Sequence, residues 1–124
     1  MKVLHQTLGT FALVVVFNAI APLPAFAQQV TSSQTPVSVV AEDFLTLATT
    51  AMNDGDYHNA VYHANKALEL DASLAEVYLL RGQAFSQLGD RDAAIADLEK
   101  AADLFLVQND RLRYQVTLDT LSGV

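Results

Sequence analysis

The chain repeats itself, because the pattern of residues 41–70 returns in a single register at residues 75–104. The residues that recur in this register are Ala41/Ala75, Glu42/Glu76, Leu45/Leu79, Gly55/Gly89, Asp56/Asp90, Ala60/Ala94, Lys66/Lys100, Ala67/Ala101 and Leu70/Leu104. The spacing between the two copies of this pattern is typical of stacked helical hairpins. One hairpin cannot bury its apolar face alone, so it needs a neighbouring hairpin. The repeat therefore predicts an all-α binding scaffold rather than a catalyst.

Residues 1–27 have the three parts of a secretory signal peptide. Lys2 gives a positive start, an apolar run begins at Phe11, and the small residues Ala25 and Ala27 fit the pockets of a signal peptidase. We expect cleavage after Ala27. The alternative is a retained membrane anchor, but the run from Phe11 to Ala21 is only about half of the roughly 20 residues that a spanning helix needs.

The net charge and the lack of cysteine limit which classes of partner and which cellular compartment we expect for the protein. Cleavage removes one basic residue, Lys2, from seven, so that six basic side chains face 14 acidic ones and the net charge becomes −8. The basic residues are scattered, whereas nucleic-acid binding requires them clustered. Without cysteine, neither a disulfide nor a lipoprotein anchor is available. We expect a periplasmic or secreted protein with no nucleic-acid partner and no membrane contact except through an uncleaved leader.

Composition and periodicity divide the rest of the chain. Residues 28–37 are polar and predict a disordered linker. Two repeats, 41–74 and 75–108, lie within the region 38–108, and residues 109–124 predict a capping helix. Apolar residues at spacings of three and four predict helices at about Val39–Asn53, Tyr57–Leu70, Leu74–Leu88 and Arg91–Val107 and a last helix after Asp110.

Turn residues predict where these helices end and begin. Gly55 is placed to close the first helix in a left-handed conformation, and Asp56 and Asp110 are placed to cap the helices that follow them. Ser73 and Glu76 have the spacing of a capping box at the start of the third helix. In the last helix we expect one apolar side, formed by Leu112, Tyr114, Val116, Leu118 and Leu121.

Small and aromatic residues recur at fixed places in both repeats. The pairs are Phe44/Tyr78, Ala48/Gly82, Gly55/Gly89, Tyr57/Arg91, Ala60/Ala94 and Ala67/Ala101. In this pattern residues 41–108 resemble the tetratricopeptide repeat. The resemblance implies two stacked antiparallel helical hairpins, an α-solenoid closed by the capping helix, with the small residues placed where helices approach closely.

In tetratricopeptide proteins the first helix of each hairpin lines a concave groove that holds a partner segment. The resemblance therefore implies a protein-binding groove formed by Glu42, Leu45, Thr46, Thr49, Met52 and Asn53 of the first repeat and Glu76, Leu79, Leu80, Gln83, Ser86 and Gln87 of the second. This lining is largely uncharged, unlike the carboxylate clamp of some family members, and suits an amphipathic helix or an extended peptide. Leu45, Leu79 and Leu80 have the alternative of lying in the core, as large apolar residues at helical spacing usually do.

The sequence predicts no catalytic, cofactor-binding or metal-binding site. His58 and His63 stand five residues apart, about 140° around a helix, and cannot share a metal ion, so we expect both to face solvent. We expect Asp97 to be an exposed carboxylate as well. Neither a phosphate-binding loop nor a nucleophile motif occurs after residue 27.

The sequence is therefore interpreted as a non-catalytic scaffold or adaptor of the bacterial cell envelope that binds a peptide or helix of an unknown protein in its groove. Two alternatives stay open. One is a structural unit that associates with copies of itself, and the other is a scaffold held at the membrane by an uncleaved leader.

Overall fold

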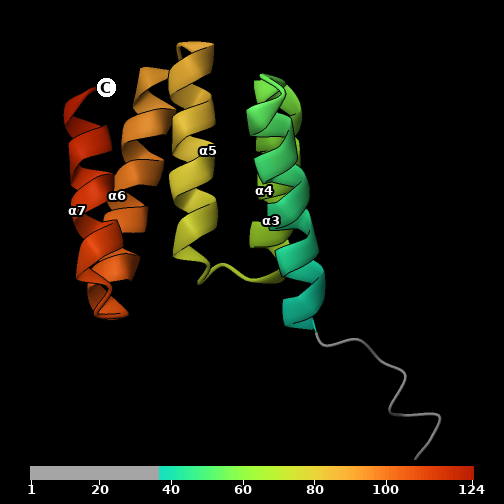
Figure 1. Ribbon diagram of the computed structural model, residues 1–124, viewed down its shortest axis with the longest axis horizontal. Coiled ribbons are helices and arrows are strands. Elements are labelled where there is room, and N and C mark those ends of the chain that lie inside the picture. The colour runs from blue at the N-terminus through green and yellow to red at the C-terminus, as the bar shows by residue number, and fades with distance from the viewer. Residues whose placement is uncertain (1–36) are drawn as a thin grey trace, which may run out of the picture. The chain divides into compact units, whose positions relative to one another are not determined.

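The computed structural model describes residues 37–124, and these form five helices and no strand (Figure 1). The helices are α3 (Val37–Asn53), α4 (Tyr57–Leu70), α5 (Ala75–Leu88), α6 (Arg91–Val107) and α7 (Arg111–Ser122). The predicted all-α class is confirmed, and α3 begins two residues before the expected Val39. The expected signal peptide, and the expected linker up to residue 36, lie outside the described residues.

The helices pack as hairpins in chain order. α3 packs against α4, and α5 packs against α6, while α4 contacts α5 and so joins the two hairpins. α7 follows and packs on α6 (Figure 1). Since consecutive helices are antiparallel, α3, α5 and α7 run in one direction and α4 and α6 in the other.

Three of the four turns between helices share one backbone geometry. Each ends the preceding helix with a left-handed residue, and these residues are Gly55 (φ 74°), Gly89 (φ 82°) and Asn109 (φ 60°). The N–H of the aspartate that follows donates to the carbonyl oxygen five residues earlier, at 2.9 Å for each of Asp56, Asp90 and Asp110. The carboxylate of each aspartate also accepts a hydrogen bond from the backbone N–H three residues later in the chain, at 3.2, 3.2 and 3.1 Å. The predicted caps Asp56 and Asp110 are confirmed.

The capping box predicted at the start of α5 is wrong. Ser73 donates both its N–H and its hydroxyl to Asp71 Oδ1, at 2.9 and 2.6 Å, so its N–H does not bind Glu76 as a capping box requires. The helix begins at Ala75. The residue before it, Leu74, has an apolar side chain that forms no capping hydrogen bond. The hydroxyl of Ser73, followed by its amide, lowers the pKa of Asp71 below its ordinary 3.8, because both hydrogen bonds favour the charged carboxylate.

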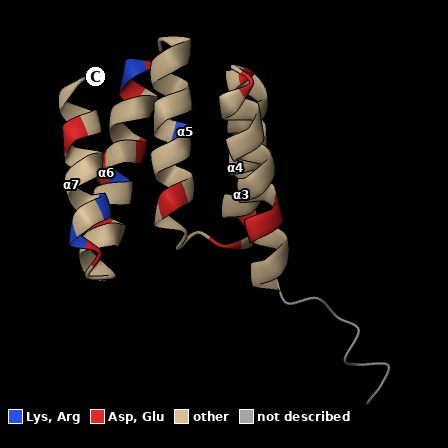
Figure 2. Cartoon of the chain, viewed as in Figure 1, with Lys and Arg blue, Asp and Glu red and all other residues tan. Residues whose placement is uncertain are grey.

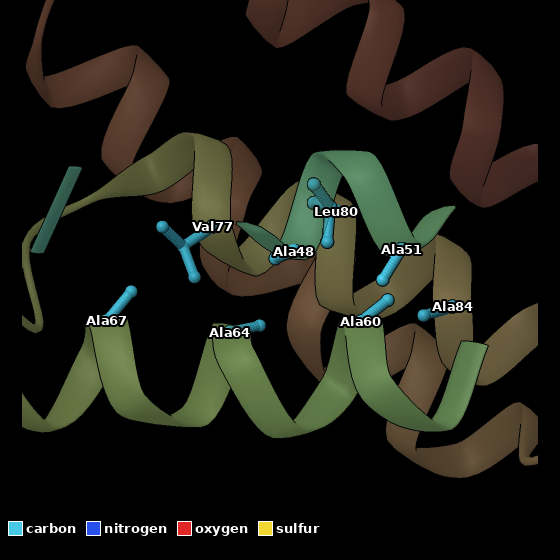
Figure 3. Packing of buried hydrophobic residues seen from close by; sticks show 8 residues of the cluster. All are labelled: Ala48, Ala51, Ala60, Ala64, Ala67, Val77, Leu80 and Ala84. Atoms are coloured by element: carbon cyan, nitrogen blue, oxygen red, sulfur yellow. The ribbon is translucent and has the colours of Figure 1, made fainter. Parts of the chain in front are cut away.

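The core between the hairpins is built largely from alanine. Ala60, Ala64 and Ala67 form one side of α4 and are fully buried. Figure 3 shows these side chains between residues of α3 and α5, namely Ala48, Ala51, Val77, Leu80 and Ala84. Their small size lets the helices approach closely, as the resemblance implied. A second cluster, formed by Ala75, Ala101 and Phe105 with Tyr114 packed against it, connects α5, α6 and α7.

One partly buried ion pair joins α5 to α6. Arg81 donates from Nε and Nη2 to the two carboxylate oxygens of Asp97, each at 2.7 Å, and from Nη1 to Asn65 Oδ1 of α4 at 2.7 Å. The hydrogen bonds to Asp97 raise the pKa of Arg81 above its ordinary value. The expectation that Asp97 is exposed is wrong, since only 6% of this residue is accessible.

The expected apolar side of α7 is only partly correct. Tyr114, Leu118 and Leu121 are half-buried, but Leu112 and Val116 are exposed. They point away because α7 packs through the side that carries Thr117, which is fully buried and donates its hydroxyl to the carbonyl of Arg113 at 2.7 Å.

Candidate binding groove

Two hollows lie along α5 on the side between α3 and α7, which we call the groove face. The first, the Glu76 hollow, has a volume of about 430 Å³ and lies where the three helices begin; it is lined by Glu42, Leu45, Thr46, Ser73, Leu74, Ala75, Glu76, Phe105, Gln108 and Arg113. The second, the Gln83 hollow, has a volume of about 410 Å³ and lies where they end; it is lined by Met52, Gln83, Ser86, Gln87, Asp119, Thr120, Gly123 and Val124.

Most of the groove residues expected from the resemblance line one of these hollows. Glu42, Leu45, Thr46 and Glu76 line the Glu76 hollow, and Met52, Gln83, Ser86 and Gln87 line the Gln83 hollow. The structure brings each set together from two helices that are far apart in the sequence.

Four other expected residues line neither hollow. Thr49 and Asn53 are exposed on α3, and Thr49 donates its hydroxyl to the carbonyl of Leu45 at 2.9 Å, which leaves only its oxygen to accept. Leu80 is 8% exposed and belongs to the alanine-rich core. Leu79 is half-buried against the cluster of Phe105. For these two leucines the structure gives the core position that was the alternative to the groove.

The two hollows differ in charge. The Glu76 hollow carries the exposed carboxylates of Glu42 and Glu76, with Arg113 opposite, whose guanidinium lies 3.6 Å from Asp110. The Gln83 hollow has amide, hydroxyl and thioether side chains, and Asp119 is the charged residue that lines it. In Figure 2, α3 and α5 each carry an acidic residue near their first turns, and the last turn of each of these two helices carries no charged residue.

The α7 side of the groove face was not anticipated. Arg113, Asp119 and Thr120 line the hollows although none was among the expected groove residues. The sequence contained a signal for this third side of the groove face. Met52, Ser86 and Thr120 are evenly spaced along the chain, each one repeat period after the one before. Extending the period past residue 108 identifies α7 as the first helix of a third unit.

The two histidines of α4 have different surroundings. His58 is exposed as expected, but the expectation for His63 is wrong. Its ring is half-buried, stacked on Phe44 at 6.2 Å and edge-on to Tyr62 at 5.2 Å. Within residues 37–124, its Nδ1 is buried without a hydrogen-bond partner.

Two other kinds of feature are absent from the described residues. Among residues 37–124, no three His, Cys, Asp or Glu side chains are grouped so that they could hold a metal ion. In the same part of the chain, no helix combines the length and the apolar character needed to cross a membrane.

Comparison with known families identifies one repeat. Residues 75–105 match the tetratricopeptide repeat family, and this segment covers α5 and most of α6. No curated protein matches the sequence. The all-helical fold of residues 37–124 is consistent with a helical repeat of the tetratricopeptide type, and α5 with most of α6 forms the matched repeat.

Proposed function

We propose that this chain is a non-catalytic adaptor that holds a segment of another protein on its groove face. Tetratricopeptide repeats generally mediate protein–protein interactions, and residues 75–105 match such a repeat. The observation that carries the proposal is the placement of both hollows on the first helices of the hairpins, where family members bind their partners. Repeats 41–74 and 75–108 supply most of this face, and residues 109–124 close it.

The lining indicates the chemistry of the segment. Leu45 and Met52 offer apolar contacts at the two ends of the groove face, and Gln83 and Gln87 offer neutral hydrogen bonds. An amphipathic helix or an extended peptide fits this combination. A lysine or arginine at the end of the segment nearest Glu76 would complement the two carboxylates there, and would also suit the net charge of −7.

The cell envelope is the proposed location. Lys2, the apolar run from Phe11 and the small residues before Gln28 support export and cleavage after Ala27. The mass of the protein purified from its own cells tests this directly. A chain that begins at Gln28 is expected, and a full-length chain in the cytosol would contradict it.

Site-specific crosslinking tests the groove. A photoreactive residue replaces Gln83 in one variant and Lys100, an exposed residue that lines neither hollow, in a matched control. Both variants are irradiated in the native cells, and mass spectrometry identifies the attached peptides. We expect one protein to be attached at position 83 and not at position 100. Equal attachment at both positions would argue against a groove.

Binding measurements with the identified segment complete the test. Gln83→Lys replaces a neutral hydrogen-bonding side chain of the Gln83 hollow by a charged one and is expected to weaken binding roughly tenfold or more. Lys100→Gln serves as the control and should leave the affinity unchanged. Calorimetry gives both values, and equal affinities for the two variants would place the segment elsewhere.

A further inference from the structure

α7 presents an apolar face that no described residue covers. Leu112 is 76% exposed and Val116 is 47% exposed, although both are large and apolar. With Gln115 and Asp119 they follow spacings of three and four and share one side of the helix, which we call the outer face of α7. Thr117 lies on the buried side.

The repeat shows what the outer face corresponds to. Gln115 and Val116 stand one repeat period after Arg81 and Gly82 of α5. Arg81 and Gly82 are among the residues through which α5 contacts α6, because Arg81 binds Asp97 and Gly82 lies against Leu98. The outer face of α7 is therefore equivalent to the surface by which α5 packs on the second helix of its own hairpin.

The outer face is separate from a third hollow, which lies between α6 and α7. That hollow has a volume of about 330 Å³ and is lined by Glu99, Ala102, Asp103, Leu106, Tyr114, Leu118 and Leu121. No outer-face residue lines it, so the outer face itself is the surface that a packed helix would cover.

The charges of α7 indicate which helix fits. Arg111 and Arg113 stand in its first turn, and Asp119 stands in its last. A cation at the first turn is disfavoured by the helix dipole, and among the described residues Arg111 forms no ion pair. An antiparallel α7 from a second copy would bring its Asp119 to Arg111, and the reverse contact would form at the other end. The sequence of α7 is therefore complementary to itself.

We propose that two copies of this chain associate through the outer faces of their α7 helices, packed antiparallel about a two-fold axis. Leu112 and Val116 of both copies become buried, and each Arg111 pairs with Asp119 of the other copy. Such an interface is isologous, so that it closes after two copies. Glu76 and Gln83 lie outside the outer face, whereas Asp119 also lines the Gln83 hollow, so the interface borders the groove face of each copy.

Sedimentation equilibrium of the full chain over a dilution series tests the proposal. A monomer–dimer equilibrium is expected, and Leu112→Glu should weaken it roughly tenfold or more. Leu47→Glu is the matched control, because Leu47 is an exposed leucine of α3, and it should leave the equilibrium unchanged. Circular dichroism verifies that both variants are folded. A monomer at every concentration would overturn the proposal and leave the outer face to a helix of another protein. A dimer that responds to Leu47→Glu and not to Leu112→Glu would overturn it as well.

Charge reversal tests the antiparallel arrangement. Arg111→Asp and Asp119→Arg should each weaken the dimer, because each places like charges together at both ends. The double variant exchanges the two charges and should restore the affinity of the unmodified chain. If the double variant is weaker than either single variant, the helices do not pair in this way.

Discussion

Gly82 lies so close to Leu98 that a Cβ atom at position 82 would stand 3.0 Å from Leu98 Cγ and 3.2 Å from the carbonyl oxygen of Ala94. Alanine would add about 1 kcal/mol of helix propensity there, but the backbone at position 94 cannot yield easily. We expect Gly82→Ala to lower the free energy of unfolding by about 1–3 kcal/mol. Urea denaturation measures the change, and a more stable variant would show that α5 and α6 can separate without cost.

Substitution of the turn glycines should also lower the stability of the fold, but for a different physical reason. A Cβ atom at Gly55 or at Gly89 would meet no atom within 4 Å, so nothing is overpacked. Both residues are left-handed, and alanine disfavours that conformation by about 1–2 kcal/mol. Gly55→Ala and Gly89→Ala should each cost about this much, by nearly equal amounts because the turns are alike. Asn109→Gly, at the third turn, should not destabilise the fold, and a large loss there would mean that the asparagine side chain has a further role.

The pair of Arg81 and Asp97 predicts strong coupling between α5 and α6. Asp97→Leu leaves the half-buried guanidinium without its carboxylate and should cost about 3 kcal/mol of unfolding free energy. The double variant Arg81→Met, Asp97→Leu removes both charges and should recover much of that loss. Equilibrium denaturation of the single and double variants gives the coupling energy, and simple additivity of the two single losses would contradict this account.

The buried alanines predict a limit on side-chain size. Ala60 and Ala94 are fully buried at equivalent places of the two hairpins. Ala60→Leu or Ala94→Leu inserts three carbons between packed helices and should destabilise the fold by about 1–3 kcal/mol. Ala96→Leu, at an exposed place on α6, is the control and should change stability little. Equal melting of all variants would refute the assigned register.

Asp71 predicts a small dependence of stability on pH. Its pKa in the folded chain lies below the ordinary 3.8 because Ser73 donates to the carboxylate. The hydrogen bonds therefore stabilise the fold above the ordinary pKa and lose this effect as the pH falls through the lower, folded value. NMR titration should show the lowered pKa in the unmodified chain and a value nearer 3.8 for Ser73→Ala. An unchanged pKa in that variant would exclude the hydroxyl as the main cause.

The sequence predicted the helices well where turn chemistry and the repeat agree. The bounds of α4 and α6 are as expected, because Asp56 and Asp90 cap them after left-handed glycines. The predicted start of α5 was wrong because Ser73 can form hydrogen bonds either with α5 or with Asp71. The sequence alone does not show that Ser73 binds Asp71.

Contacts between helices were harder to predict. Arg81 and Asp97 are 16 residues apart on different helices, and nothing local marks an aspartate that will be buried with a partner. Spacing on α7 identified apolar residues but not the neighbour that each one meets, so Leu112 was assigned to the packed side. Most of the residues expected from family positions line one of the two hollows, whereas the burial of Leu80 depends on how the hairpins stack.

The alanine-rich interior bears on how ligands can be found. An alanine side chain removes far less apolar surface from water than a leucine does, so each helix contact contributes little to stability. When the free energy of unfolding is small, a molecule that binds only the native state produces a measurable increase in stability, because its binding raises the melting temperature. Thermal-shift screening of synthetic peptides is therefore a sensitive way to find what this chain recognises.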